Sequence, residues 1–232
     1  MTTPLGPSSI ATNLARVRER VEVACERSAR DPESVTLIAV TKTWPAETLL
    51  EAVAAGATHL GENRVQEALA KASAVEAGAR AAGLPAPTWH LIGHLQTNKV
   101  RDALALFRHV HSVDSERLLG AIAAAAAEQV EVFLEVNVAA EPSKFGIAPA
   151  ELPAMLTLAR SLHRIRVGGL MTVAPRVADP EEARPVFRRL AGLAREHALP
   201  HLSMGMTEDF EVAIEEGATH VRVGRAIFGE RQ

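Results

Sequence analysis

The chain has 232 residues, 47% of them hydrophobic, and a formal net charge of −3. This length and apolar content suffice for one sizeable core, and the mild acidity argues against electrostatic capture of nucleic acid or of an anionic membrane. No apolar stretch approaches a membrane span, and the first twenty residues lack the apolar core of a signal peptide. The single cysteine, Cys25, cannot form an internal disulfide, so we expect a cytoplasmic protein.

Short apolar runs alternate with helical patterns along the whole chain. A first helix is predicted over 9–29, capped by Ser8 or Ser9, with Cys25 on its buried stripe. Strands are predicted near 35–40, 58–61, 88–93, 109–113, 131–138, 166–172, 201–205 and 220–224. Further helices are predicted near 46–55, 63–77, 98–105, 115–128, 149–162, 180–197 and 208–216.

This alternation predicts an α/β protein, a single-domain (β/α)8 TIM barrel with an extra N-terminal helix. The domain would cover residues 1–232, with the helix within 1–30 packed on the barrel. A doubly wound open sheet is the structural alternative.

Local signals refine several boundaries. Asp179 predicts a helix cap, and Pro185 should kink the following helix or delay its start. Gly78–Pro87 is predicted to be a loop. Three polar residues that follow strands are interpreted as helix caps: Ser112, Asp114 and Thr207.

Residues 52–60 resemble residues 213–221, and each copy holds one glycine, Gly56 and Gly217. Both glycines suit the left-handed position that ends a helix. The similarity therefore predicts two equivalent joints between a helix and a strand.

Lys42 directly follows the apolar run Val35–Val40, and Pro45 comes shortly after it. A parallel strand that ends there would present Lys42 at the carboxyl edge of a sheet or barrel, where α/β folds bind ligands. A partly desolvated lysine amine can lose its proton near neutral pH and attack a carbonyl carbon to form a Schiff base. A solvated loop lysine is the alternative that position alone leaves open.

The ends of the last two predicted strands resemble a phosphate site. Ser203, Gly205 and Gly224 would lie on adjacent strands, where barrels often bind phosphate through glycine amides and helix N-termini. Tight turns would also explain the two glycines.

Other chemistries fit poorly. His90 and His94 are four residues apart, but Gly93 and the predicted strand prevent a shared helical face, so we expect no metal site. The chain has no GxSxG, Walker-type or GxGxxG motif. A lysine opposite a phosphate anchor leaves two explanations, a phosphorylated aldehyde cofactor or a Schiff-base aldolase that acts on a sugar phosphate.

Short motifs then occur in order from near residue 35 to the C-terminal end. They are Ala39–Lys42, Gly61–Glu67, Trp89–Lys99, Glu135–Asn137, Ser143–Ile147, Gly169–Thr172, Leu202–Asp209 and Val221–Gly229. In these motifs the chain resembles the pyridoxal-phosphate homeostasis proteins, the YggS/PROSC family, whose barrel is similar to the N-terminal domain of alanine racemase.

The resemblance implies that pyridoxal 5′-phosphate (PLP) is bound as an internal aldimine on Lys42. It implies that four residues hold the phosphate, largely through main-chain donors: Ser203, Gly205, Gly224 and Arg225. Family members often have threonine where Arg225 stands, so a hydroxyl contact would be lost here.

The resemblance also places residues around the cofactor ring. Asn63 would lie near the ring substituents and Met171 near the ring face. Arg222 would face the pyridine nitrogen. Since arginine does not readily release its proton, it would keep that nitrogen unprotonated and weaken the electron sink.

The function implied is non-catalytic: the protein would buffer and carry PLP without robust turnover. Apo PLP enzymes would be its recipients, and it would be a monomer or a weak homodimer. The chain has no tyrosine, so it cannot supply the tyrosine base of the two-base racemases. A PLP-dependent racemase or decarboxylase, the sugar-phosphate aldolase and a purely regulatory partner protein remain the alternatives.

Two further lysines lie in the matching motifs. Lys144 follows a strand end and could receive or hand on cofactor, or it could be a solvated loop cation. Lys99 is expected to begin a helix and to have a structural or surface role.

Overall fold

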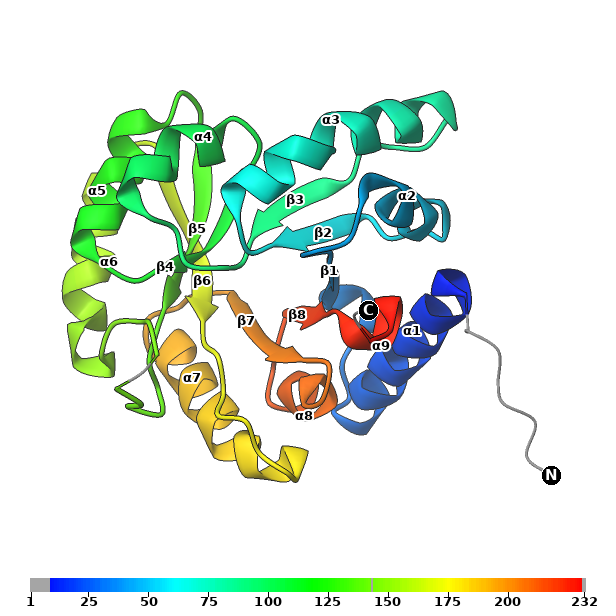
Figure 1. Ribbon diagram of the computed structural model, residues 1–232. Coiled ribbons are helices and arrows are strands. Elements are labelled where there is room, and N and C mark those ends of the chain that lie inside the picture. The colour runs from blue at the N-terminus through cyan, green and yellow to red at the C-terminus, as the bar shows by residue number, and fades with distance from the viewer. Residues whose placement is uncertain (1–8, 143, 231–232) are drawn as a thin grey trace.

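Eight parallel strands close into a barrel in chain order in the computed structural model, which describes residues 9–142 and 144–230 (Figure 1). The strands are β1 (Thr36–Val40), β2 (His59–Glu62), β3 (Thr88–Leu91), β4 (His109–Val113), β5 (Val130–Glu135), β6 (Ile165–Met171), β7 (His201–Met206) and β8 (His220–Val223). β1 pairs with β8 as well as with β2, which closes the sheet. The predicted TIM barrel is therefore confirmed, and the open sheet is excluded.

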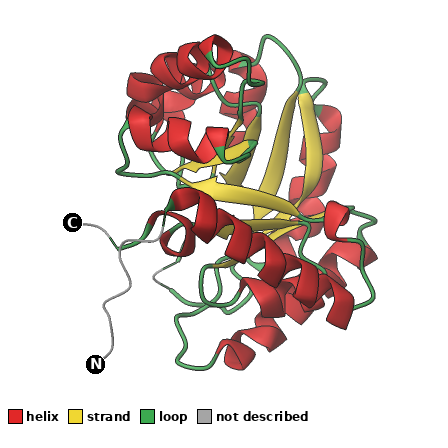
Figure 2. Ribbon diagram, turned by 90° about the vertical axis from the view of Figure 1, so that its right-hand side faces the viewer, coloured by secondary structure: helices red, strands yellow, loops and turns green. Residues whose placement is uncertain are grey.

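Helices surround the strands on the outside of the barrel (Figure 2). They are α1 (Ile10–Arg27), α2 (Ala46–Ala54), α3 (Val65–Ala81), α4 (Val100–Leu104), α5 (Glu116–Ala125), α6 (Leu152–Ser161), α7 (Arg184–Glu196), α8 (Phe210–Glu215) and α9 (Arg225–Phe228). Short 3-10 turns precede four elements: η1 (Pro32–Ser34), η2 (Thr97–Lys99), η3 (Pro149–Glu151) and η4 (Pro180–Ala183). No helix among the described residues has both the length and the apolar composition needed to cross a membrane.

α1 is the predicted extra helix, and it packs against α2, α8 and α9 (Figure 1). Ser9 caps it by accepting a hydrogen bond from the Thr12 amide, whereas Ser8 lies outside the described residues. Cys25 is fully buried on its inner face, as its position in the helical stripe predicts.

Three further predictions about element boundaries are confirmed. Asp179 accepts from the Glu181 amide at the start of η4, and α7 begins only at Arg184, with Pro185 in its first turn. Proline lacks an N–H, so it is tolerated in a first turn but not farther along a helix. Gly56 and Gly217 both adopt positive φ, at 94° and 103°, at the two equivalent joints.

The prediction of a loop over Gly78–Pro87 is partly wrong, because α3 continues to Ala81. A Cβ atom at position 78 would lie 2.7 Å from Leu50 of α2. Gly78 therefore permits two helices to approach closely rather than starting a turn.

The three predicted caps are also wrong, because tertiary contacts engage each side chain. The Ser112 hydroxyl donates to the Gly93 carbonyl at 2.6 Å, and Asp114 contacts His94 at 3.1 Å. Thr207 accepts from the Gly224 amide at 3.2 Å. Ser115, one residue after Asp114, caps α5 instead.

Candidate functional site

Lys42 lies immediately beyond the carboxyl end of β1, in the turn from Thr41 to Trp44, and it is half-buried. Gly224, at the end of the neighbouring strand β8, faces the end of β1. A Cβ atom on Gly224 would lie 3.5 Å from the Cβ of Val40. The barrel therefore brings Lys42 beside the loop that follows β8, which the sequence predicted to bind phosphate.

Lys71 of α3 fixes the backbone on both sides of Lys42. Its ammonium donates to the carbonyl oxygens of Thr41 and Trp44, at 2.9 and 3.1 Å. It also pairs with Glu62 at 2.7 Å and with Glu67 at 3.2 Å. We call Glu62, Glu67 and Lys71 the lysine-loop clamp.

The clamp also holds the residue that follows Lys42. Thr43 has a φ of 71°, a conformation that is uncommon outside glycine, and its amide donates to the Glu67 carboxylate. Such a conformation persists only where surrounding contacts fix it. The hydroxyl of Thr41, on the other side of Lys42, donates to the carboxylate of Glu62. Side-chain contacts therefore hold the backbone on both sides of Lys42.

Arg222 of β8 is buried inside the barrel. It donates to the Ser203 carbonyl at 2.8 Å, to the Ser203 hydroxyl at 2.6 Å and to the Thr172 carbonyl at 2.9 Å. Burial lowers the pKa of Arg222 to about 10, while Glu135 and Asp209 oppose that shift. Arg222 is therefore a fixed cation at neutral pH.

Glu135 lies at the carboxyl end of β5, at the same end of the barrel as Lys42, which we call the mouth. Its carboxyl group has a shifted pKa. Burial, together with nearby Asp114 and against the opposing effect of Arg222, raises its pKa to about 7. Glu135 is therefore partly protonated near neutral pH.

Gly205 adopts a φ of 88°, and a Cβ atom there would lie 2.5 Å from the Cβ of Ala213 in α8. Both the conformation and the close packing require glycine. Gly205, near the end of β7, and Gly224, directly after β8, therefore each present main chain without a side chain.

The other predicted site residues are placed as follows. Asn63 is half-buried beyond β2. Its backbone lies close to Gly93, since a Cβ atom on Gly93 would be 2.7 Å from the Cα of Asn63. Met171 is buried and pairs in register with Ser203. Arg225 directs its side chain to solvent, where it pairs with Glu208 at 2.7 Å.

Strand order brings most of the predicted site together. Met171, Ser203 and Arg222 lie on the consecutive strands β6, β7 and β8, and Lys42 follows β1, the next strand round the barrel. The Ser203 hydroxyl, however, points into the barrel, and the Arg225 side chain points out of it.

Sequence reasoning missed the roles of Lys71, Glu62 and Glu135. Glu67 and Lys71 are four residues apart on one helix, a spacing that signals an ion pair and could have identified the clamp. The pKa of Glu135 has no such signal, because it arises from burial among residues distant in sequence.

The remaining lysine of the mouth, Lys144, is engaged in local contacts. It pairs with Glu141 at 2.7 Å and donates to the Val173 carbonyl at 3.2 Å. Within 9–142 and 144–230, no group of three His, Cys, Asp or Glu side chains is arranged to hold a metal ion.

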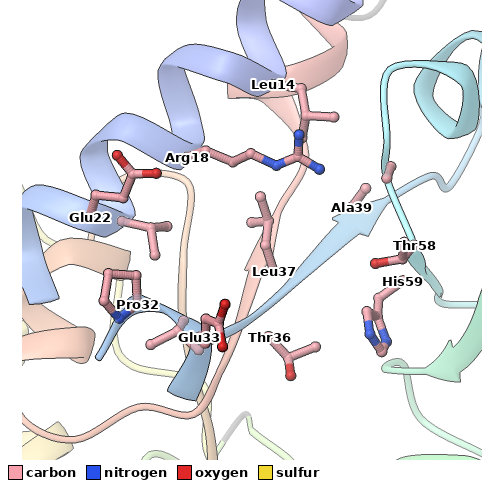
Figure 3. A pocket seen from close by; sticks show the side chains of 13 residues that line it. Leu14, Arg18, Glu22, Pro32, Glu33, Thr36, Leu37, Ala39, Thr58 and His59 are labelled. Atoms are coloured by element: carbon pink, nitrogen blue, oxygen red, sulfur yellow. The ribbon is translucent and has the colours of Figure 1, made fainter. Parts of the chain in front are cut away.

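A cavity of about 370 Å³ lies elsewhere, between α1 and the amino ends of β1 and β2 (Figure 3). Arg18, Leu37 and His59 are among its lining residues. None of the predicted site residues lines it, so it is separate from the Lys42 mouth.

The barrel and the lysine mouth define a class of proteins, which comparison with known sequences identifies. Residues 12–232 match the family described as alanine racemase, N-terminal domain. A pyridoxal phosphate homeostasis protein of Aquifex aeolicus is 43% identical, over 94% of this chain and 97% of that protein. The chain belongs to the pyridoxal phosphate homeostasis protein family.

Solved structures agree with this assignment. PipY of Synechococcus elongatus with PLP bound is 38% identical, with a TM-score of 0.78 over 95% of this chain and 100% of that one. Alanine racemase from Corynebacterium glutamicum has a TM-score of 0.68 at 19% identity, over 96% of this chain but 60% of the racemase. The second likeness concerns the fold alone.

Proposed function

We propose that this chain binds PLP covalently at Lys42 and buffers and carries it in the cell, without robust turnover. The observation that supports this most strongly is the lysine-loop clamp, which fixes Lys42 beside Gly224 at the barrel mouth. The PLP-bound state of PipY, a relative that covers 95% of this chain, supports the same ligand.

The residues at the mouth fit PLP. The cofactor supplies an aldehyde that condenses with a primary amine with loss of one water molecule, and Lys42 supplies that amine. The backbone at Gly205 and Gly224 would receive the phosphate, with Ser203 and Arg225 contributing through the main chain. Arg222, already a fixed cation, would face the pyridine nitrogen and keep it unprotonated.

Two predicted residues complete this arrangement. Asn63 would lie beside the ring substituents, and Met171 would pack on the ring face. Both belong to loops or strand ends that border the mouth.

The chemistry of the side chains favours a carrier over an enzyme. The chain lacks any tyrosine to serve as the second base of a racemase. A pyridine ring with an unprotonated nitrogen is also a weaker electron sink, so it stabilises a substrate carbanion less. Delivery to apo PLP enzymes, a cytoplasmic location and a monomeric or weakly dimeric state belong to the same proposal.

The test combines binding with turnover. The purified protein should bind PLP with a new absorption band, which Lys42→Ala abolishes and Lys99→Met retains. Incubation of the loaded protein with L-amino acids in D₂O should give no exchange of the α-proton. Stereospecific exchange that Lys42→Ala removes would establish an amino-acid enzyme instead, and repeated cleavage of a sugar phosphate without cofactor would establish an aldolase.

A further inference from the structure

Three imidazoles form a hydrogen-bonded chain inside the barrel. Nδ1 of His59 lies 2.9 Å from Nε2 of His90, and Nδ1 of His90 lies 3.0 Å from Nε2 of His111. Nδ1 of His111 lies 2.8 Å from the hydroxyl oxygen of Ser203, which accepts from Arg222 at 2.6 Å. This chain of hydrogen bonds therefore runs from the half-buried His59, at the amino end of β2, to Arg222 near the mouth.

Arg222 sets the direction of this chain. Its guanidinium can only donate, so the Ser203 oxygen is an acceptor in that contact. If His111 also donated to Ser203, the hydroxyl proton would have no acceptor among the described residues. A fully buried hydroxyl proton without an acceptor is strongly unfavourable. Ser203 therefore donates its proton to Nδ1 of His111.

The same argument determines which nitrogen carries the proton in each imidazole. With Nδ1 of His111 accepting, its proton is on Nε2, which donates to Nδ1 of His90. His90 then carries its proton on Nε2 and donates to Nδ1 of His59. Desolvation lowers the pKa of both His90 and His111 well below the ordinary value, so both rings are neutral at pH 7.

Packing keeps the two inner rings in place. His111 stacks on Phe133 with ring centroids 4.2 Å apart, and His90 stacks on His109 at 4.6 Å. Neither His111 nor Ser203 has any exposed surface. The Ser203 hydroxyl and its contact with His111 are therefore shielded from bulk water.

We propose that His111, acting through the Ser203 hydroxyl, is a positioning residue for Arg222, and that His111, His90 and His59 form a one-way relay with each proton on Nε2. Without His111 the Ser203 hydroxyl must rotate to direct its proton elsewhere. That rotation moves the oxygen lone pair that accepts from Arg222, so Arg222 loses part of its support. The effect on cofactor affinity rests on the proposed function, whereas the tautomers are properties of the protein alone.

The first test is ¹⁵N NMR of the imidazoles in the cofactor-free protein at neutral pH. His90 and His111 should each show a protonated Nε2 and an unprotonated Nδ1. Ser203→Ala should shift the Nδ1 signal of His111. A proton on Nδ1 of His111 in the unsubstituted protein would overturn the relay, and this measurement needs no variant to fold.

The second test is a double-mutant cycle on the PLP dissociation constant. His111→Phe keeps a ring on Phe133 but lacks the acceptor, so it should weaken binding about tenfold, as should Ser203→Ala. The double variant should be no weaker than Ser203→Ala alone, because both act through one contact. Losses that multiply to about a hundredfold would overturn the proposal.

Two further variants separate positioning from packing. His111→Asn returns a carbonyl oxygen near the place of Nδ1 and should restore affinity to within about threefold of the unsubstituted protein. His201→Asn alters a half-buried histidine outside the relay and should leave affinity unchanged. Equal weakening by His111→Asn and His111→Phe would contradict a role for the acceptor. If the unsubstituted protein does not bind PLP, the proposed function fails, and the NMR result alone decides the relay.

Discussion

Lys71 and Glu62 form a buried ion pair of 2.7 Å between α3 and the end of β2. The same ammonium binds the carbonyl oxygens of Thr41 and Trp44, which bracket Lys42. A buried ion pair that lay far from the predicted site would have only a structural role. Here it connects the packing of α3 on the barrel to the backbone on both sides of Lys42.

Lys71→Met should destabilise the protein by about 3–5 kcal/mol, because it leaves the buried carboxylate of Glu62 without its cation. Burial already raises the pKa of Glu62, a shift that the Lys71 hydrogen bond opposes. Urea unfolding measures the loss. Adding Glu62→Gln to Lys71→Met should recover part of it, and an equal or greater loss in the double variant would show that the pair is not responsible.

Glu135→Gln should stabilise the protein above pH 7 and have little effect at pH 5. The folded-state pKa of Glu135, about 7, is higher than its ordinary value of 4.5. The folded protein therefore favours the protonated carboxyl, and this contribution is lost as pH rises through 7. The gain should reach about 3 kcal/mol in denaturant unfolding at high pH.

The exposed carboxyl of Glu51 provides a matched control for this comparison. Glu51→Gln should leave the difference between pH 5 and pH 8 unchanged. A Glu135→Gln variant that destabilises the protein equally at both pH values would contradict the raised pKa.

Stability should fall as pH decreases from 6.5 towards 3, in part because of His220. Burial, helped by the nearby charges of His201, His59, His109 and Arg222, lowers the pKa of His220 to about 3. The unfolded chain therefore binds a proton in this range that the folded protein does not, which costs about 1.4 kcal/mol per pH unit.

His220→Gln should remove that share of the slope when unfolding free energy is measured from pH 7 to pH 4. His163→Gln, at an exposed position, should leave the slope unchanged. Identical slopes in the His220 variant and the unsubstituted protein would contradict the assignment.

Gly169→Ala should prevent folding or cost more than about 4 kcal/mol. A Cβ atom at this position of β6 would overlap the carbonyl oxygen of His201 on β7, and neither backbone can move without breaking the barrel. Gly120, inside α5, has no neighbouring atom within 4 Å of such a Cβ. Gly120→Ala should therefore stabilise the protein by about 0.5–1 kcal/mol, and thermal unfolding of both variants checks the contrast.

The barrel was predictable because eight apolar runs and their intervening helical patterns leave few arrangements that bury every strand. The caps at Ser9 and Asp179 were predictable too, but those at Ser112, Asp114 and Thr207 were not, because these three side chains find partners on other elements. Local propensity gives way to a tertiary contact when both are available.

The predicted site shows the same division. Strand ends fix where a backbone lies, so the proximity of Lys42 and Gly224 followed from the barrel alone. Side-chain direction depends on register, and the pairing of β7 with β8 shifts between Ser203 and Met206. Such a register shift changes the face of the sheet to which a side chain points. No pattern in the sequence predicted this shift.

The most direct test of the central claim is the site of covalent attachment. The chain has four lysines, Lys42, Lys71, Lys99 and Lys144, so borohydride reduction of the PLP-loaded protein followed by peptide mass mapping can distinguish them all. We predict a reduced pyridoxyl group on the peptide that contains Lys42. A label on Lys71, Lys99 or Lys144 with Lys42 unmodified would contradict the account.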